Sequence, residues 1–323
     1  MRALITGVTG QDGAYLSKLL LDKGYDVDGL SPRHSTLNTW RLEEMGICDH
    51  PSFTLFVGDI TCPASINFHV KVGGYDEIYN LGAMTFVAES FNSPIATMHI
   101  NGLGSVNILE AIKNHSPKTR FYQASTSEMF GNTGGMLNED SPMIPVSPYG
   151  IAKLYAHHMV KYYREHHGIH ASAGILFNHE SPYRGIEFVS RKICDGVAQI
   201  KAGKIDHIEL GNLDACRDWG YAGDYVKAMW LMLRQDTPDD YVIATGETRS
   251  INYFLGRAFD NADIDMCGRI KTNDVFKRKS DVHILCGDAA KAGKKLGWVP
   301  TAGIDTLIKI MMDAEMERHE VGR

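Results

Sequence analysis

The 323-residue sequence has no run of about 18 apolar residues, the length that a membrane-spanning helix needs. No apolar signal core precedes the first strand-like segment, so we expect a cytoplasmic protein. There is no excess of positive charge either, because 33 Lys and Arg stand against 39 Asp and Glu. This balance argues against a general binder of nucleic acid or of anionic membranes. A phosphorylated small molecule stays possible, because it needs only a local cluster of cations.

Patterns typical of disulfides and metal sites are also missing. The six cysteines are widely spaced, with no C-x-x-C pair and no histidine at zinc spacing. The fourteen histidines include no H-E-x-x-H motif. We therefore predict free thiols and no bound metal.

Short apolar runs alternate with segments of helical periodicity through the first half of the chain. The runs are Ala3–Gly7, Asp26–Leu30, Phe53–Val57, Glu77–Leu81, Arg120–Ala124 and Ala171–Phe177. Such alternation predicts an α/β fold with a doubly wound parallel sheet of the Rossmann type. After about Asn178, Pro and Gly interrupt the pattern, which indicates a smaller α/β substrate-binding domain. Because Asp224–Leu233 has a strong helical pattern, we expect interleaved domains: residues 1–176 plus about 213–250, and about 177–212 plus 251–323.

A glycine-rich turn lies directly after the first predicted strand and before a predicted helix. It reads Gly7-Val8-Thr9-Gly10-Gln11-Asp12-Gly13, which is G-x-x-G-x-x-G. Glycines permit a tight turn and a close backbone approach to a pyrophosphate, and the helix N-terminus favours negative charge. The turn and its context predict a dinucleotide site.

The end of the second predicted strand bears on the choice between NAD and NADP. NAD-binding proteins of this type usually carry an acid there, but no acid directly follows Leu30. Arg33 and Ser35 could instead bind a 2′-phosphate, so we expect NADP, unless the register differs by two residues and Asp28 reaches the ribose. After the third strand, Asp59 could accept from adenine with Ile60 against the ring; a simple loop cap is an equal alternative.

Tyr149 and Lys153 form a Y-x-x-x-K motif at the start of a predicted helix, where Ser147-Pro148 supplies the cap. The spacing puts both side chains on one helix face. We expect the ammonium to lower the phenol pKa from about 10, so that Tyr149 can take a hydroxyl proton as hydride leaves the same carbon. Lys153 can also hold the nicotinamide ribose.

The segment Ser125-Thr126-Ser127-Glu128 follows the fifth predicted strand, where loops of a doubly wound sheet line the ligand crevice. A hydroxyl there can bond the substrate oxygen that becomes a ketone. The carboxylate of Glu128 suggests removal of a carbon-bound proton that a neighbouring ketone has made acidic. The alternative is a Glu that only caps a helix.

The chain resembles the extended short-chain dehydrogenases/reductases and, within them, the GDP-mannose 4,6-dehydratase family. The matching strings include TGVTGQDG (6–13), YNLGA (79–83), FYQASTSEMFG (121–131), SPYGIAKLYA (147–156), GILFNHESPYRG (174–185) and LGNLDACRDWG (210–220). The resemblance implies a catalytic set of Thr126, Glu128, Tyr149 and Lys153. The cofactor contacts that it implies come from residues 7–13, Arg33, Asp59, Ile60, Leu81, Gly82, Ala83, His179 and Arg184. The substrate contacts that it implies come from Asn178, Glu180, Lys192, Arg217 and Arg278. To these substrate contacts we add Thr85. For Arg217, an ion pair with Asp218 is the alternative.

The activity that the resemblance implies is dehydration of GDP-mannose to GDP-4-dehydro-6-deoxy-mannose, with tightly bound NADP regenerated in each turnover. It also implies a homodimer or homotetramer. The runner-up is a related NADP-dependent epimerase or 4-keto reductase, and Glu128 argues against it because a simple reductase needs no base for C5. A catalytically inactive NADP-binding scaffold is a third possibility, against which the intact catalytic set argues.

Overall fold

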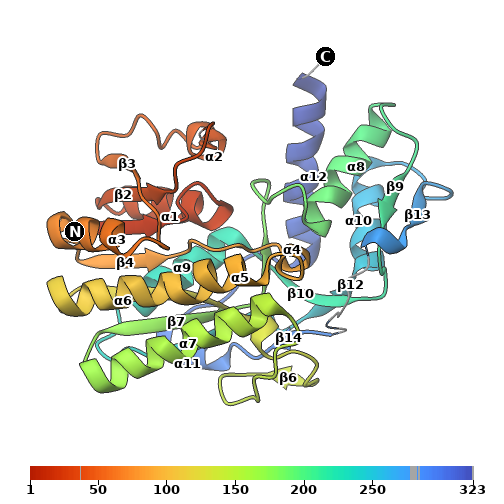
Figure 1. The fold of residues 1–323 in the computed structure, drawn as a ribbon. Helices are drawn as coiled ribbons and strands as arrows, with labels where there is room; N and C mark the ends of the chain where they lie inside the picture. Colours follow the sequence, from red (N-terminus) through yellow and green to blue (C-terminus); the bar gives the residue numbers. More distant parts are fainter. Residues whose placement is uncertain (37, 277–281, 283, 322–323) are drawn as a thin grey trace.

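The computed structural model describes residues 1–36, 38–276, 282 and 284–321 (Figure 1). Its largest element is a sheet in which every neighbouring pair of strands is parallel. In spatial order the strands are β3 (Phe53–Val57), β2 (Asp26–Ser31), β1 (Arg2–Thr6), β4 (Glu77–Asn80), β5 (Arg120–Thr126), β7 (Ala171–Leu176) and β11 (Asp240–Ile243). The order reverses between β1 and β4, the point where ligands bind in such sheets. The predicted doubly wound fold is confirmed.

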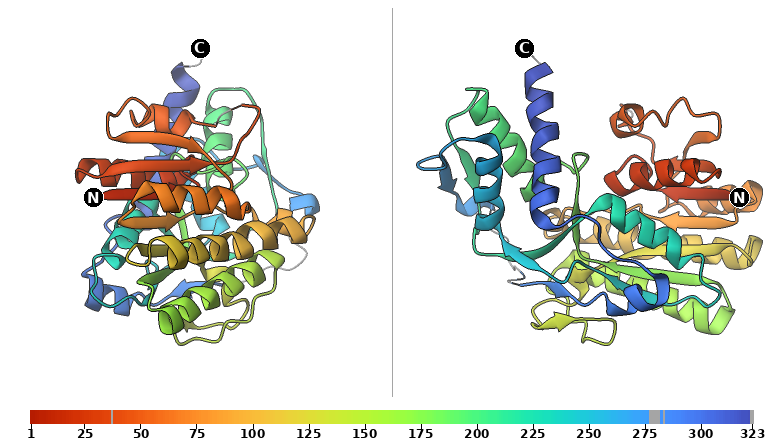
Figure 2. Two further views of the ribbon diagram at one scale, coloured as in Figure 1. Left: turned by 60° about the vertical axis from the view of Figure 1, so that its left-hand side comes forward. Right: turned by 180° about the vertical axis from the view of Figure 1, so that it is seen from behind.

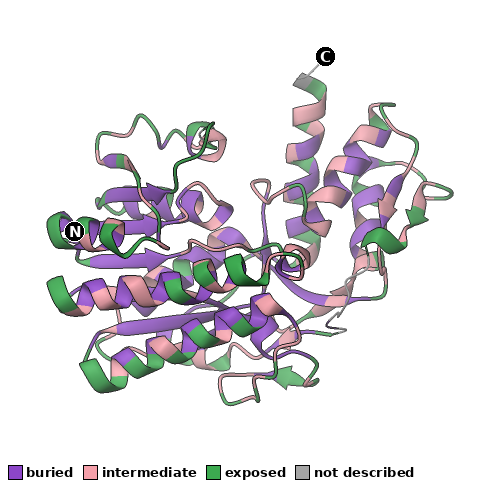
Figure 3. Cartoon of the chain, in the orientation of Figure 1, coloured by how far each residue is buried: buried purple, intermediate pink, exposed green. Residues whose placement is uncertain are grey.

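Helices cover both faces of this sheet, so its central strands are buried on both sides, whereas the edge strand β3 is only partly buried (Figure 3). Over one face lie α1 (Gln11–Asp22), α2 (Trp40–Glu44), α9 (Ala222–Met232) and α11 (Ala290–Leu296). Over the other lie α3 (Pro63–Gly73), α6 (Gly104–His115) and α7 (Pro148–His167). The short helices α4 (Val87–Ser90) and α5 (Pro94–Thr97) and a π-helical turn (Met98–Leu103) lead into α6. The helix expected over Asp224–Leu233 is α9, which packs against α1.

The remaining elements form a second body beyond the sheet, clearest from behind in Figure 2. The strand β10 (Cys216–Tyr221) pairs with β8 (Asn178–Glu180) in parallel and with β12 (Thr248–Ser250) in antiparallel. The helices α8 (Val189–Lys201), α10 (Ile251–Ala262) and α12 (Ile304–Val321) share one apolar core. A smaller pair of this body is β9 (Ile208–Leu210) with β13 (Ile270–Thr272), and a 3₁₀ turn spans Asp274–Phe276. The pair of β6 (Met136–Leu137) with β14 (Cys286–Gly287) lies instead against the large sheet, where Leu137 shares a core with Ile175 and Val242. The domain boundaries expected near 176, 213 and 250 stay a prediction.

Local sequence fixes where α7 begins and ends. The Ser147 hydroxyl accepts a hydrogen bond from the Gly150 amide at 3.1 Å, and Pro148 occupies the first helical position. Gly168 ends the helix in a left-handed conformation with φ of 65°, which glycine adopts without steric cost. These signals place Tyr149 in the first turn, directly beside the carboxyl end of β5.

Candidate active site

A cavity of about 710 Å³ lies at the carboxyl ends of the sheet strands, between the sheet and the second body. It collects most of the residues that the sequence predicted for cofactor, substrate and catalysis. Those that line it are Gly7, Thr9, Gly10, Gln11, Asp12, Gly13, Asp59, Ile60, Leu81, Gly82, Ala83, Thr85, Thr126, Glu128, Tyr149, Lys153, Asn178, His179 and Arg184. Residues more than 170 positions apart in sequence therefore face one space.

The glycine turn at the end of β1 is shaped for close backbone approach. Gly7 has a φ of +67°, and its amide donates to the Leu30 carbonyl oxygen at 3.2 Å. A Cβ on Gly7 would lie 2.8 Å from the Gly82 nitrogen, and one on Gly13 would lie 2.5 Å from the Gly7 oxygen. The turn leads straight into α1, whose first N–H groups have no carbonyl partner within the helix. This arrangement fits a dinucleotide pyrophosphate.

The side chain of Asp28 points away from the cofactor region. Asp28 lies inside β2, opposite Leu4, and its carboxylate accepts from Arg2 at 2.8 Å and from the Tyr75 hydroxyl at 2.9 Å. The register is therefore the one for which the sequence favours NADP. Arg33 and Ser35 are exposed and do not line the cavity, whereas their neighbours Pro32 and His34 do.

Asp59 serves its own loop as well as facing the cavity. Its Oδ1 accepts hydrogen bonds of 2.8 Å from both the amide and the hydroxyl of Thr61. The loop cap that the sequence allowed is thus present. A role toward adenine stays a prediction, with Ile60 lining the cavity next to it.

Tyr149 and Lys153 come from adjacent turns of α7, and each is fixed to β5. The Tyr149 side chain shares a hydrogen bond with Thr126, and Lys153 Nζ donates to the Ala124 carbonyl oxygen at 2.8 Å. Burial lowers the pKa of Lys153 to about 8. Burial likewise raises the pKa of Tyr149 to about 12, with Thr126 opposing and Glu128 adding to the rise.

The prediction that Lys153 lowers the pKa of the Tyr149 phenol is therefore wrong. The Lys153 ammonium is directed to a backbone carbonyl, and its nitrogen lies 6.0 Å from the centre of the Tyr149 ring. Desolvation of the phenol outweighs every opposing influence. Sequence spacing places the two groups on one face of the helix but says nothing about how dry their surroundings are.

Glu128 lies in a 3₁₀ turn, Ser127–Met129, that directly follows β5. The cap of this turn is Thr126, whose hydroxyl accepts from the Glu128 amide at 3.3 Å. The Glu128 residue is 9% exposed and lines the same cavity as Tyr149. The Glu128 carboxylate is close enough to the Tyr149 phenol for its charge to raise the phenol pKa, and both side chains face one cavity.

The expected substrate residues do not all meet in the main cavity. Asn178 and Thr85 line it. Glu180 does not; its carboxylate accepts from the Ser190 hydroxyl at 2.6 Å and pairs with Arg184 at 3.0 Å. The Lys192 ammonium lies 3.4 Å from the centre of the Phe276 ring. Arg278 lies outside the residues that the structure describes.

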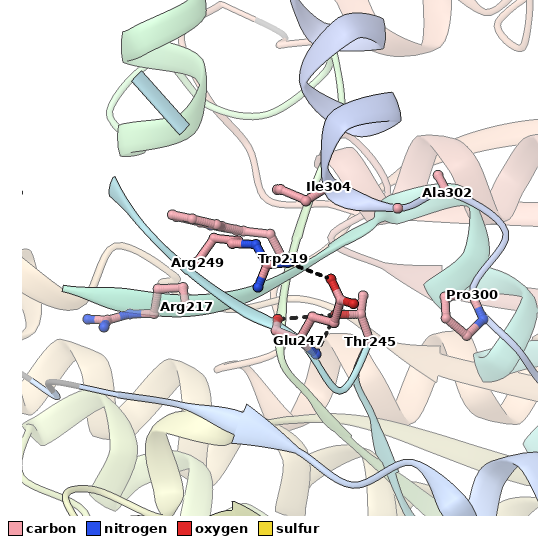
Figure 4. Close-up of a pocket in the computed structure, with 9 residues that line it drawn as sticks. Arg217, Trp219, Thr245, Glu247, Arg249, Pro300, Ala302 and Ile304 are labelled. Atoms are coloured by element: carbon pink, nitrogen blue, oxygen red, sulfur yellow. Dashed lines mark hydrogen bonds and ion pairs between the residues drawn. The ribbon is translucent and has the colours of Figure 1, made fainter. Parts of the chain in front are cut away.

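Arg217 lines a second, smaller cavity of about 200 Å³ between β10, β12 and the start of α12 (Figure 4). Arg249 borders the same space and pairs with Glu247 at 3.4 Å, whereas Arg217 points away from that pair. The carboxylate of Asp218 accepts hydrogen bonds from the Thr245 and Gly246 amides at 2.8 and 2.9 Å. The diphosphate role of Arg217 stays a prediction.

Sequence reasoning missed one arginine at the cofactor turn. Arg41 of α2 lines the main cavity and donates to the carbonyl oxygens of Tyr183 at 2.7 Å and of Thr9 at 3.2 Å. Burial lowers the pKa of Arg41. No spacing signal marks it, because α2 has only five residues and reaches the turn through tertiary packing.

Three further findings concern the cysteines, an acidic cluster and the helices. All six cysteines are free thiols, as predicted. Asp195, Glu315 and His319 cluster between α8 and α12, but Glu315 pairs there with both Arg191 and Arg318. Within the described part of the chain, every helix is too short or too polar to cross a bilayer.

Comparisons with known proteins show the family of the chain. The family model described as GDP-mannose 4,6 dehydratase matches residues 4–311. The chain belongs to the GDP-mannose 4,6-dehydratase family. GDP-mannose 4,6 dehydratase 1 of Arabidopsis thaliana is 43% identical to it, covering 98% of this chain and 90% of the relative. The Homo sapiens GDP-mannose 4,6 dehydratase is also 43% identical, covering 98% and 91%. The family resemblance expected from the motifs is therefore confirmed.

Solved structures of lower sequence identity share the fold of this family member. The dTDP-glucose 4,6-dehydratase DesIV of Streptomyces venezuelae, solved with NAD and TYD bound, superposes with a TM-score of 0.89 at 21% identity, covering 99% of this chain and 98% of DesIV. RMD from Pseudomonas aeruginosa, solved with NADPH, superposes with a TM-score of 0.81 at 21% identity, covering 98% and 99%. Both comparisons support the Rossmann-type architecture.

Proposed function

We propose that this protein dehydrates GDP-mannose to GDP-4-dehydro-6-deoxy-mannose and regenerates its nicotinamide cofactor in every turnover. The observation that carries the proposal is that Glu128 and Tyr149 line one cavity, together with the glycine turn of β1. An acid–base pair of this kind serves a reaction that removes a proton from oxygen and another from carbon. Membership of the GDP-mannose 4,6-dehydratase family supports the choice of sugar nucleotide.

The proposed cofactor is NADP, held by the 7–13 turn, Leu81–Ala83 and His179, with Arg33 and Ser35 toward the 2′-phosphate. Two features support NADP over NAD: no carboxylate directly follows Leu30, and Asp28 is already held by Arg2 and Tyr75. When bound, the oxidised nicotinamide would supply a hydride acceptor, its reduced form a hydride donor, and its positive charge would lower the pKa of a neighbouring phenol.

In the first proposed step Tyr149, as the phenolate that the positive charge of a bound nicotinamide would favour, takes the proton of the sugar O4 hydroxyl as the C4 hydride departs. Thr126, which shares a hydrogen bond with Tyr149 in the structure, would donate to the same sugar oxygen. Lys153, held against Ala124, orients the ribose and adds positive charge beside the developing ketone. The product of this step is a 4-keto sugar whose C5 proton is acidic.

In the second step Glu128 removes that C5 proton, and the C6 hydroxyl leaves as water with a proton returned by Glu128. With the hydride that a reduced cofactor would supply to C6, Tyr149 gives its proton to C5. The water that leaves consists of the C6 hydroxyl and the C5 proton, and the O4 proton ends on C5, so the sugar has lost one water in total. No net oxidation or reduction has occurred, so the cofactor stays in place.

The alternative is a related epimerase or 4-keto reductase, and one experiment separates them. The protein is incubated with a panel of nucleotide sugars and NADP, without any added reductant, and the masses of the products are measured by mass spectrometry. The proposal expects GDP-mannose to lose one water. An epimerase would leave the mass unchanged, and a reductase would leave GDP-mannose intact; either result overturns the proposal.

We also propose that the protein acts in the cytoplasm as a homodimer or homotetramer. Large apolar side chains are exposed along the π-helical turn and α7, among them Leu103, Ile151 and Tyr155. Exposed apolar surface of this kind is typical of subunit contacts. Light scattering at micromolar protein measures the mass directly, and a monomer would contradict the proposal.

A further inference from the structure

The cofactor turn carries a carboxylate that faces a buried histidine. Asp12, the second residue of α1, lies with its Oδ2 atom 2.7 Å from His179 Nε2. The other ring nitrogen, Nδ1, lies 2.8 Å from the Phe177 carbonyl oxygen. A carbonyl and an ionised carboxylate can only accept hydrogen bonds, so both nitrogens of His179 must donate. A histidine that donates from both nitrogens is an imidazolium.

The surroundings fix this pair in place. Gln11 donates to both the Asp12 carboxylate and the His179 carbonyl, each at 3.1 Å, and Ser181 donates to Gln11 at 2.8 Å. The Tyr225 ring stacks on the imidazole with centroids 4.5 Å apart and an interplanar angle of 20°. Ring rotation would break both hydrogen bonds, so the geometry allows one arrangement.

The charges around the pair agree with an ionised state. Burial acts to lower the pKa of His179, but the charge and hydrogen bond of Asp12 outweigh it and raise the pKa. Burial likewise acts to raise the pKa of Asp12, and His179 outweighs it. The other titratable groups that interact electrostatically with Asp12 are Arg184, Lys153, Tyr122, Tyr149 and Tyr225. Arg184 opposes the charge of His179 but is itself paired with Glu180.

We infer that His179 is a fixed positive charge that cancels Asp12 and so allows the glycine turn to hold the diphosphate of a dinucleotide. Both residues line the cavity at the turn. An uncompensated carboxylate among the first N–H groups of α1 would repel a diphosphate placed there. The pair also fastens the turn to β8, the first strand of the second body. The inference rests on the proposed function only in taking NADP as the dinucleotide.

The first test is a charge-compensation cycle read out by NADP binding, using calorimetry on the full-length protein. His179→Gln keeps a donor for Asp12 but removes the charge, and we expect the NADP dissociation constant to rise about tenfold or more. Adding Asp12→Asn to that variant removes the unbalanced carboxylate and should recover most of the lost affinity. A merely structural role predicts that the two losses add, and that result overturns the inference. His158→Gln, an exposed histidine outside the cavity, is the matched control.

The second test needs no variant. In ¹⁵N-labelled protein at about pH 7.5, a unit above the ordinary histidine pKa of about 6.5, NMR should show His179 protonated on both nitrogens. A neutral tautomer overturns the inference. Different results would refute the proposed function and this inference. If the wild-type protein binds no NADP, the proposed function is refuted. If His179→Gln binds NADP as tightly as the wild type, only this inference is refuted.

Discussion

Lys153 donates a 2.8 Å hydrogen bond to the carbonyl oxygen of Ala124, two residues before the Thr126 side chain that bonds Tyr149. The helix α7 is therefore fastened to β5 at two neighbouring points, one through each member of the Y-x-x-x-K motif. This fastening, rather than a direct contact between ammonium and phenol, holds the two side chains toward the cavity. A substitution at Lys153 can therefore change the charge there without removing the hydrogen bond that holds Tyr149 to Thr126.

The Lys153 ammonium should give activity an alkaline limit. Its pKa is lowered to about 8, so the charged form predominates below that pH and is lost as pH rises through it. We expect kcat to fall above about pH 8 in the wild-type enzyme. In Lys153→Arg the guanidinium stays charged. The fall in kcat above about pH 8, the alkaline limb of the pH profile, should therefore disappear even if the maximal rate is lower. Initial rates between pH 6 and 10 measure this; an unchanged limb in Lys153→Arg contradicts the assignment.

Tyr149→Phe should abolish proton transfer while leaving the sugar nucleotide bound. We expect kcat to fall by about 10²–10⁴, the usual contribution of one acid–base group, with little change in the GDP-mannose dissociation constant. Steady-state kinetics and calorimetry measure the two quantities. The control is Tyr162→Phe on the same helix, because Tyr162 is 46% exposed and outside the cavity. Equal losses in both variants would argue against a role specific to Tyr149.

Glu128→Gln should separate oxidation from dehydration. The amide cannot take the C5 proton, so we expect GDP-mannose to be oxidised at C4 and turnover to stop before water leaves. Stopped-flow absorbance should show reduced cofactor accumulating to about one equivalent of sites, while mass spectrometry shows no loss of water. Glu165→Gln, on the exposed face of α7, serves as the control. Product formation at the wild-type rate would remove Glu128 from the mechanism.

Arg33→Ala should weaken NADP binding without weakening NAD binding. A charged hydrogen bond to the 2′-phosphate is worth roughly tenfold in affinity, and NAD has no such phosphate. Binding titrations of the wild type and the variant with NADP and with NAD give the change in each dissociation constant. Equal effects on both would show that the NADP preference lies elsewhere, with His34, which lines the cavity, as the next residue to change.

Ser147→Ala should destabilise the start of α7. The hydroxyl accepts from the Gly150 amide at 3.1 Å, and losing such a cap costs about 1 kcal/mol of the unfolding free energy. Since Tyr149 lies in the same turn, kcat should fall too. Urea unfolding measures the first effect; a midpoint equal to that of the wild type would mean that water replaces the cap without cost.

The features that sequence predicted are those set by local geometry. The glycines at 7–13 form a tight turn, and Ser147-Pro148 begins a helix, whatever the rest of the chain does. The parallel sheet followed from the alternation of apolar runs and helical segments. Features that depend on packing between distant segments were missed or misjudged. Arg41 reaches Thr9 through the fold, and Glu180 turns toward Ser190 rather than the cavity. The pKa of Tyr149 depends on how far its ring is desolvated, which spacing cannot give.

The most direct test of the central claim follows one hydrogen atom through the reaction. GDP-mannose carrying deuterium at C4 is incubated with the protein and a catalytic amount of NADP, and the product is examined by NMR and mass spectrometry. Internal transfer predicts a sugar that has lost one water and carries the deuterium at C6. Deuterium found in the free nucleotide, or a product that keeps its C6 hydroxyl, would contradict the account.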